Sequence, residues 1–161
     1  MENQKIDFAD CIDLMKQSDY RHIRNLVSYL RALKNSFGDD VAKIVEDISC
    51  KDAFNRYKNL AIDQEDRTIE KLISILWGER PIPGLHQYTY KKENDGFQFN
   101  CTVCPYVDMF KKLDATEWGY RLYCALDPPL VEGFNENIGF RRTKTLMEGH
   151  DCCDHFYYYL K

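Results

Sequence analysis

The chain has 161 residues, of which 44% are hydrophobic and 14% aromatic, and this composition excludes an intrinsically disordered or collagen-like protein. It carries 22 basic and 26 acidic side chains, a formal net charge of −4, and no basic block, so we expect no nucleic-acid partner. The length suits one compact domain, and residues 1–161 are predicted to form a single α+β domain.

The first ten residues carry three acidic side chains and no apolar run, which is atypical of a signal peptide. The longest apolar run, residues 72–77, is far shorter than the roughly 20 residues that a membrane-spanning helix needs. We therefore expect a cytoplasmic protein with no membrane partner. The cysteine count is seven, and an odd number in this compartment argues against a complete set of disulfides.

The N-terminal part, residues 1–78, shows the periodicity of amphipathic helices. Helices are expected at residues 23–33, 41–48, 54–61 and 69–76. Gly38 is a typical terminator for the first helix, and Asp39 is a candidate N-cap for the second. Pro81, Pro83 and Gly84 are expected to stop helix formation after the fourth.

The C-terminal part, residues 84–161, changes to the two-residue period of strands. Strands at residues 86–92 and 97–102 flank an Asp-Gly turn and predict a β-hairpin, and residues 138–147 and 153–160 predict a second one. Helices are expected at residues 105–113 and 117–126, where Asp127-Pro128-Pro129 interrupts or kinks the second. The order predicts N-terminal helices packed on two antiparallel hairpins with intervening helices.

Five of the seven cysteines lie in the last 61 residues. The Cys101-x-x-Cys104 spacing is typical of half of a tetrahedral zinc site. The other half would have to come from another cysteine or a histidine, and no second C-x-x-C exists; Cys152 and Cys153 are adjacent, so on a strand they point to opposite faces. We expect no metal and no other cofactor, with structural zinc at Cys101 and Cys104 as the alternative.

Several of these cysteines are candidate nucleophiles, namely Cys104, Cys124 and Cys153. A thiol becomes nucleophilic when a nearby cation or helix N-terminus lowers its pKa, and Arg141, Arg142, His150 or His155 can supply that cation. A buried cysteine is otherwise a small hydrophobic residue, and an arginine on a strand is otherwise a solvated edge charge. The residue types alone leave these alternatives open.

The C-terminal half also contains an ordered set of short motifs. They are Cys104-Pro105-Tyr106, Cys124-x-x-Asp127, Arg142-Thr143-x-Thr145-Leu146-x-x-Gly149 and Cys153-Asp154. In combination they resemble the L-2-amino-thiazoline-4-carboxylic acid hydrolase family, over roughly residues 84–161. The chain departs from that family after Cys153-Asp154, where the family has an aromatic residue and this chain has His155.

The resemblance implies a hydrolase acting on carbon–nitrogen bonds of a cyclic amidine. It would convert L-2-amino-thiazoline-4-carboxylate, a small-molecule carboxylate, to N-carbamoyl-L-cysteine in cysteine metabolism. The implied catalytic residues are Cys124 or Cys153 as nucleophile, with an activated water as the alternative, and Asp127 or Asp154 as the carboxylate that holds the protonated amidine. The implied substrate-binding residues are Arg142, Thr143, Thr145, Cys104 and Asp154.

The same layout is similar, more distantly, to the 4-vinyl reductase-like ligand-binding domains and to the TRAPP transport-particle fold. Metal-binding members of that wider group hold zinc with a glutamate and a cysteine at the positions of Arg142 and Thr145, so the resemblance argues against zinc here. It also offers an alternative function, a non-enzymatic small-molecule-binding or sensing module. The N-terminal helical stripes can pair between chains, which allows a homodimer.

Overall fold

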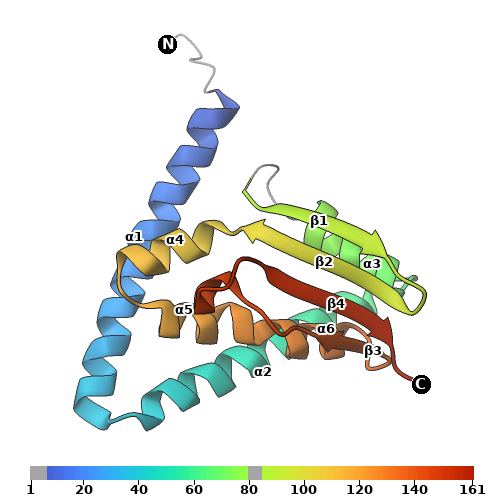
Figure 1. Cartoon of the computed structure of the whole chain (residues 1–161). Helices are drawn as coiled ribbons and strands as arrows, with labels where there is room; N and C mark the ends of the chain where they lie inside the picture. The colour runs from blue at the N-terminus through green and yellow to red at the C-terminus, as the bar shows by residue number, and fades with distance from the viewer. Residues whose placement is uncertain (1–6, 80–84) are drawn as a thin grey trace.

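The computed structural model describes residues 7–79 and 85–161. It shows a four-stranded antiparallel sheet with helices packed against it, so the α+β class is confirmed (Figure 1). Pro81, Pro83 and Gly84, which we expected to stop a helix, lie outside the described residues. Within the described residues, no helix is both long enough and apolar enough to cross a membrane.

Two long helices form the N-terminal part, α1 (Phe8–Phe37) and α2 (Asp40–Ile62). They meet at Gly38, whose φ of +88° is a conformation that favours glycine, so the expected helix end is confirmed. Asp39 precedes α2, but its side chain makes no capping hydrogen bond. The separate helix expected at residues 54–61 is wrong, because nothing between residues 48 and 54 breaks the helix and α2 continues through them.

A short helix, α3 (Ile69–Ile73), continues into the π-helical segment η1 (Ser74–Glu79). Together they correspond to the helix expected at residues 69–76. The Thr68 side chain accepts a hydrogen bond from the backbone N–H of Lys71, which satisfies one free donor at the start of α3. The helix therefore begins where a capping residue precedes its first apolar side chain.

The sheet has the strand order β1-β2-β4-β3, formed by β1 (Gln87–Lys92), β2 (Gly96–Val103), β3 (Ile138–Arg141) and β4 (Cys153–Tyr159). The two expected hairpins are therefore joined into one sheet, because β2 pairs with β4 and places Cys101 opposite Cys153. The strand expected at residues 138–147 is too long. It ends at Arg141, because Thr145 caps a 3-10 turn, η3 (Leu146–Glu148).

Four helical segments connect the two hairpins: α4 (Pro105–Lys112), α5 (Thr116–Leu122), η2 (Cys124–Leu126) and α6 (Asp127–Phe134). Pro128 and Pro129 lie in the first turn of α6, where a missing N–H costs nothing. The Asp-Pro-Pro sequence therefore begins a helix here. Asp127 is the first residue of α6.

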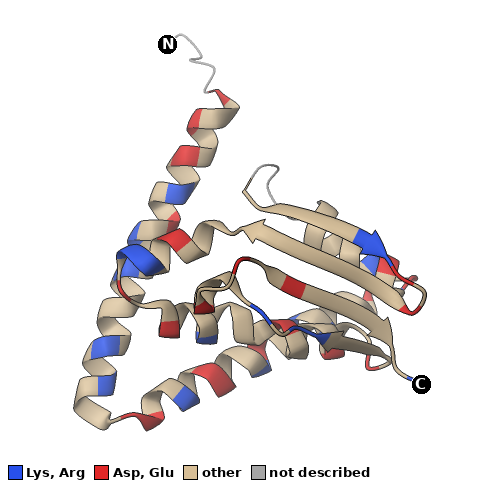
Figure 2. Cartoon of the chain, in the orientation of Figure 1, with Lys and Arg blue, Asp and Glu red and all other residues tan. Residues whose placement is uncertain are grey.

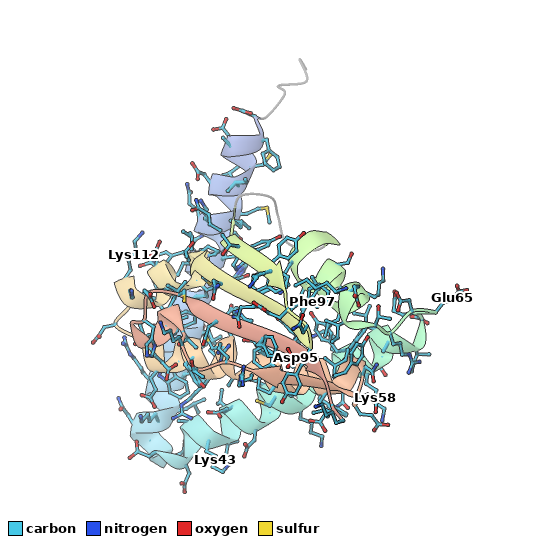
Figure 3. All side chains as sticks on the ribbon, turned by 45° about the vertical axis from the view of Figure 1, so that its right-hand side comes forward. Lys43, Lys58, Glu65, Asp95, Phe97 and Lys112 are labelled. Carbon is cyan, nitrogen blue, oxygen red and sulfur yellow. The ribbon has the colours of Figure 1, made fainter. Side chains whose placement is uncertain are left out.

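The core consists of two hydrophobic clusters. One lies between the sheet and α2, α3 and α6, and includes Ala53, Leu72 and Phe134. The other lies among α1, α4 and α5, where Val27 of α1 meets Phe110 of α4. Charged side chains such as those labelled in Figure 3 at Lys43, Lys58 and Lys112 are exposed. The site described next lies between the two clusters.

Candidate functional site

A cavity of about 190 Å³ lies at the end of the sheet where β2 passes into α4. Its walls come from η1, β2, α4, η2, the start of α6, the end of β3 and β4. The lining residues are Leu76, Trp77, His86, Cys101, Cys104, Tyr106, Tyr123, Cys124, Asp127, Arg142, Cys153, His155 and Tyr157. Segments far apart in the sequence thus meet around one small, partly open pocket.

A buried ion pair between Asp127 and Arg142 forms part of the cavity wall. Arg142 donates from Nη1 to Asp127 Oδ2 and from Nη2 to the Cys124 carbonyl, at 2.9 Å in the second case. Burial is the largest single influence and acts to lower the pKa of Arg142, but Asp127, Cys124 and Tyr120 together outweigh it and leave that pKa above its ordinary value. The cavity therefore holds a permanent cation beside a carboxylate.

His155 lies against the same carboxylate. Its Nε2 is 3.4 Å from Asp127 Oδ2, and the residue is only 7% exposed. Its other ring nitrogen, Nδ1, is buried and has no hydrogen-bond partner among residues 7–79 and 85–161. An imidazole held by a carboxylate on one side and unpaired on the other is suited to exchange a proton with a bound molecule.

Four thiols line the cavity, those of Cys101, Cys104, Cys124 and Cys153. Burial raises the pKa of each of them above the ordinary value, to about 12 for Cys101. The Cys153 sulfur already accepts a hydrogen bond from the backbone N–H of Leu146 at 3.2 Å. All four cysteines are therefore neutral thiols at rest, and any reaction through one of them requires a base.

The described residues contain no group of three or more His, Cys, Asp or Glu side chains arranged to hold a metal ion. At the positions where the wider group holds zinc, both side chains have other partners. Arg142 pairs with Asp127, and Thr145 Oγ1 donates to Glu148 Oε2 at 2.7 Å.

Aromatic rings complete the cavity wall. The Tyr106 and Tyr123 rings stack with their centroids 4.3 Å apart, and the Trp77 indole N–H donates to the Tyr157 hydroxyl at 3.2 Å. Burial, with a smaller contribution from His155, lowers the pKa of His86, so His86 is neutral at physiological pH. The polar groups at Asp127, Arg142 and His155 are thus surrounded by flat apolar surfaces, which suits a small planar molecule.

The structure brings together five of the eight predicted site residues. Cys104, Cys124, Asp127, Arg142 and Cys153 all line the cavity, whereas Thr143, Thr145 and Asp154 do not.

The remaining three residues hold the loop that follows β3. Asp154 accepts hydrogen bonds from the Thr143 N–H at 2.9 Å, the Thr143 hydroxyl at 2.6 Å and the Lys144 N–H at 2.5 Å. Thr145 is 2% exposed and bonds with Glu148. These bonds fix the backbone next to Arg142.

Sequence reasoning overlooked five cavity residues, namely Leu76, Trp77, His86, Tyr123 and Tyr157, and considered His155 only as a cation. A signal for His155 was present: on a strand it shares a face with Cys153 two residues earlier. Trp77 and His86 flank a Pro- and Gly-containing segment, and no local pattern connects them to the cysteines.

The sheet, the helices against it and the cavity between them define an α+β protein with a pocket of small-molecule size. The chain belongs to the L-2-amino-thiazoline-4-carboxylic acid hydrolase family, whose model matches residues 19–157. The match extends from the cavity half into both long helices. No curated protein matches the chain.

The fold is also similar to the crystal structure of the phenol-responsive sensory domain of the transcription activator PoxR with phenol. The TM-score is 0.53 at 12% sequence identity, and the match covers 84% of this chain and 73% of that one. At this identity the likeness concerns the fold alone. It agrees with the more distant resemblance to ligand-binding domains found in the sequence.

Proposed function

We propose that this chain is a hydrolase that opens a small cyclic amidine, with L-2-amino-thiazoline-4-carboxylate as its substrate and N-carbamoyl-L-cysteine as its product. Beyond membership of the family, one observation carries the proposal. The partly buried Asp127–Arg142 pair, with His155 beside it, lies in the wall of the cavity. We place the reaction in the cytoplasm and assign it no metal or cofactor.

The charges of the substrate complement those of the cavity. The thiazoline carries a carboxylate and, when protonated, a cationic amidine. The Arg142 guanidinium has N–H groups left over after its bonds to Asp127 and Cys124, and these can bind the carboxylate. Asp127 can hold the amidinium through a charge-assisted hydrogen bond, which makes the ring carbon more electrophilic.

The product determines which bond must break. Both nitrogens of the amidine remain on the carbonyl carbon of N-carbamoyl-L-cysteine, so water adds to the ring carbon and the ring carbon–sulfur bond breaks. The proposal therefore replaces the expected hydrolysis of a carbon–nitrogen bond with hydrolysis of a carbon–sulfur bond. The attacking group gives up a proton and the departing sulfur takes one. In this proposal His155 carries the proton between them through Nδ1, which is buried without a hydrogen-bond partner among the described residues.

The nucleophile in this proposal is the thiol of Cys124 or Cys153. Because burial raises the pKa of both thiols, the proton must leave during the attack, and His155 shares a strand face with Cys153. The thiol sulfur would bond to the ring carbon as the ring sulfur leaves as a thiol. Water would then displace the cysteine and complete the hydrolysis.

The test is a turnover assay with the thiazoline carboxylate on metal-depleted protein, reading N-carbamoyl-L-cysteine by mass spectrometry. We expect turnover by the native chain and a loss of roughly 10²–10⁴-fold in kcat for His155→Gln. Arg142→Lys should chiefly raise KM. Cys11→Ala is the matched control, because Cys11 lies on α1 and does not line the cavity.

Three outcomes would contradict parts of the proposal. Absence of turnover by the native chain would remove the activity, and turnover that appears only with added zinc would remove the metal-free mechanism. Full turnover by both Cys124→Ala and Cys153→Ala would show that water attacks directly.

A second candidate function is a small-molecule-binding or sensing module without turnover. It is favoured by the aromatic cavity wall and by the fold shared with a phenol-responsive sensory domain. Thermal unfolding with and without phenol tests it, because a ligand that binds the native state raises Tm. A Tm increase with phenol, together with no turnover of the thiazoline, would support this function over the hydrolase.

A further inference from the structure

Helix α1 carries a stripe of eight side chains, of which six are exposed and two, Ile12 and Asp19, are half-buried. The stripe consists of Phe8, Ile12, Met15, Asp19, His22, Leu26, Tyr29 and Leu33. Of these, Phe8, Met15, Leu26, Tyr29 and Leu33 are 59%, 43%, 39%, 66% and 43% exposed. The residues that α1 buries against the body, Ile23, Val27 and Leu30, lie outside the stripe.

The spacing of this α1 stripe is that of a coiled coil. From Phe8 to Leu33 its members alternate strictly between steps of four and three residues, which is the a/d repeat of the heptad. It spans roughly 38 Å of helix at 1.5 Å per residue. A helix that packs only against its own domain needs one apolar face, so a second face with heptad spacing indicates a second helix.

The charges on α1 are divided between its two halves, as Figure 2 shows. Residues 7–19 carry four acidic side chains and one lysine, whereas residues 20–37 carry four basic side chains and no acidic one. The acidic half extends beyond the rest of the molecule in Figure 1. Its complement in charge is the basic half of the same helix in another copy, approached from the opposite direction.

We propose that this chain forms a homodimer in which the α1 helices of two copies pack antiparallel along this stripe. One register pairs every a position with a d position. It places Phe8 opposite Leu33, Ile12 opposite Tyr29, Met15 opposite Leu26, and Asp19 opposite His22 of the second copy, each pair occurring twice by symmetry.

Other arrangements of the two α1 helices are less favourable because of the charges and contacts along the stripe. A parallel pair brings Asp19 against Asp19 of the second copy, and two like charges at a seam repel. An antiparallel pair shifted by one heptad places Asp19 opposite Met15, or His22 opposite Leu26, and loses contacts at one end. The polar residues at the centre of the stripe therefore select one register, as single polar residues do in coiled coils.

The first test is the mass in solution, measured by analytical ultracentrifugation of the full chain at tens of micromolar. We expect a dimer for the native chain, a monomer for Tyr29→Glu, and a dimer for Ser28→Glu, which is the matched control because Ser28 is exposed outside the stripe. Circular dichroism confirms that each variant is folded. A monomeric native chain, or a Tyr29→Glu variant that stays dimeric, overturns the proposal.

The second test examines the register by charge exchange. Asp19→Lys should weaken the dimer at least tenfold in Kd, and Asp19→Lys with His22→Glu should restore it. In a parallel pair the double variant would still place like charges together, so failure of the rescue overturns the register.

The third test uses disulfide formation between Met15→Cys and Leu26→Cys chains. In the antiparallel register the two positions meet only in a mixture, since in either variant alone the new cysteines lie roughly 16 Å apart along the axis. We expect an additional cross-link in the mixture that neither variant shows alone. Cross-linking of Met15→Cys with itself would point to the parallel arrangement and overturn the proposal.

Discussion

Asp127 joins two other polar residues of the cavity, since Arg142 and His155 both approach the same carboxylate oxygen. The Arg142 side chain is 7% exposed, so the Asp127 carboxylate, and not water, stabilises the charge of its guanidinium. The geometry makes Asp127 a structural residue as well as a candidate for chemistry. A loss of activity in an Asp127 variant must therefore be read together with its stability.

We predict that Asp127→Asn lowers the free energy of unfolding by roughly 2–4 kcal/mol, because it leaves the Arg142 guanidinium buried without a counterion. Urea denaturation at neutral pH measures this. The double variant Asp127→Asn, Arg142→Gln removes both charges and should lose less than the single variant. Equal losses in the two variants would show that the unpaired charge is not the cause.

A second prediction concerns thiol reactivity. Cys101 is 2% exposed and burial raises its pKa to about 12, so it should react with iodoacetamide at neutral pH far more slowly than Cys11 on α1. Mass spectrometry of peptides after timed alkylation gives both rates. Similar rates would mean that the cavity opens to solvent on the time scale of the experiment.

At the scale of elements, the close packing of α6 on α2 depends on one glycine. A Cβ atom at Gly133 would lie 2.3 Å from the Phe54 carbonyl oxygen, so any side chain there pushes the helices apart. We predict that Gly133→Ala costs roughly 1–3 kcal/mol and lowers Tm by several degrees. Gly78→Ala is the control, since its nearest neighbour is 4.0 Å away, and it should leave Tm almost unchanged.

The loop after β3 gives another prediction. Thr145 accepts a hydrogen bond from the Glu148 N–H at 3.1 Å and donates to the Glu148 carboxylate, while being 2% exposed. Thr145→Val should cost about 1–2 kcal/mol in chemical denaturation, because it leaves a donor without its cap. Thr145→Ser keeps the hydroxyl and should cost less. If the two variants are equally destabilised, packing of the methyl group is the main contribution.

For the whole molecule, the buried thiols and tyrosines predict how stability depends on pH. Burial raises the pKa of Cys101 and of Tyr123 to about 12 each, above their values in the unfolded chain. At neutral pH these groups are protonated in both states, so their raised pKa does not change the free energy of unfolding. As the pH rises through the pKa in the unfolded chain, near 9.0 for a thiol, the unfolded state loses its proton first and becomes more favourable.

We therefore predict that the free energy of unfolding falls between about pH 8 and pH 10, by about 1 kcal/mol or more for Cys101 alone. Urea denaturation at a series of pH values tests this. Cys101→Ala should show a weaker dependence on pH than the native chain. A native stability that is constant up to about pH 10 would contradict the raised pKa values.

How far the sequence predicts the fold varies from element to element. The β1–β2 hairpin follows from alternating side chains around an Asp-Gly turn, and the end of α1 follows from Gly38, because both signals are local. The length of α2 does not follow from local signals, since the apolar helical periodicity is interrupted around Ser49. Packing against α6 and the sheet provides the burial that continues the helix through it.

For the candidate site too, local motifs could be predicted from the sequence and long-range contacts could not. The motifs around Cys104, Cys124, Asp127, Arg142 and Cys153 are recognisable in the sequence, and all five residues line one cavity. The partner of Arg142 could not be read from the sequence. The resemblance suggested a free guanidinium for a carboxylate, whereas the structure pairs it with Asp127 and with a backbone carbonyl.

By itself, the sequence determined the α+β class, the family and five of the residues that line the cavity, because periodicity, turn residues and motifs are properties of neighbouring positions. Only the tertiary structure decided that the two hairpins form one sheet and that Trp77, His86 and His155 enclose the same space. The physical reason is that a cavity, a desolvated thiol and a buried ion pair arise from contacts between distant segments. Those contacts set the local dielectric and the hydrogen-bond partners, which no short stretch of sequence specifies.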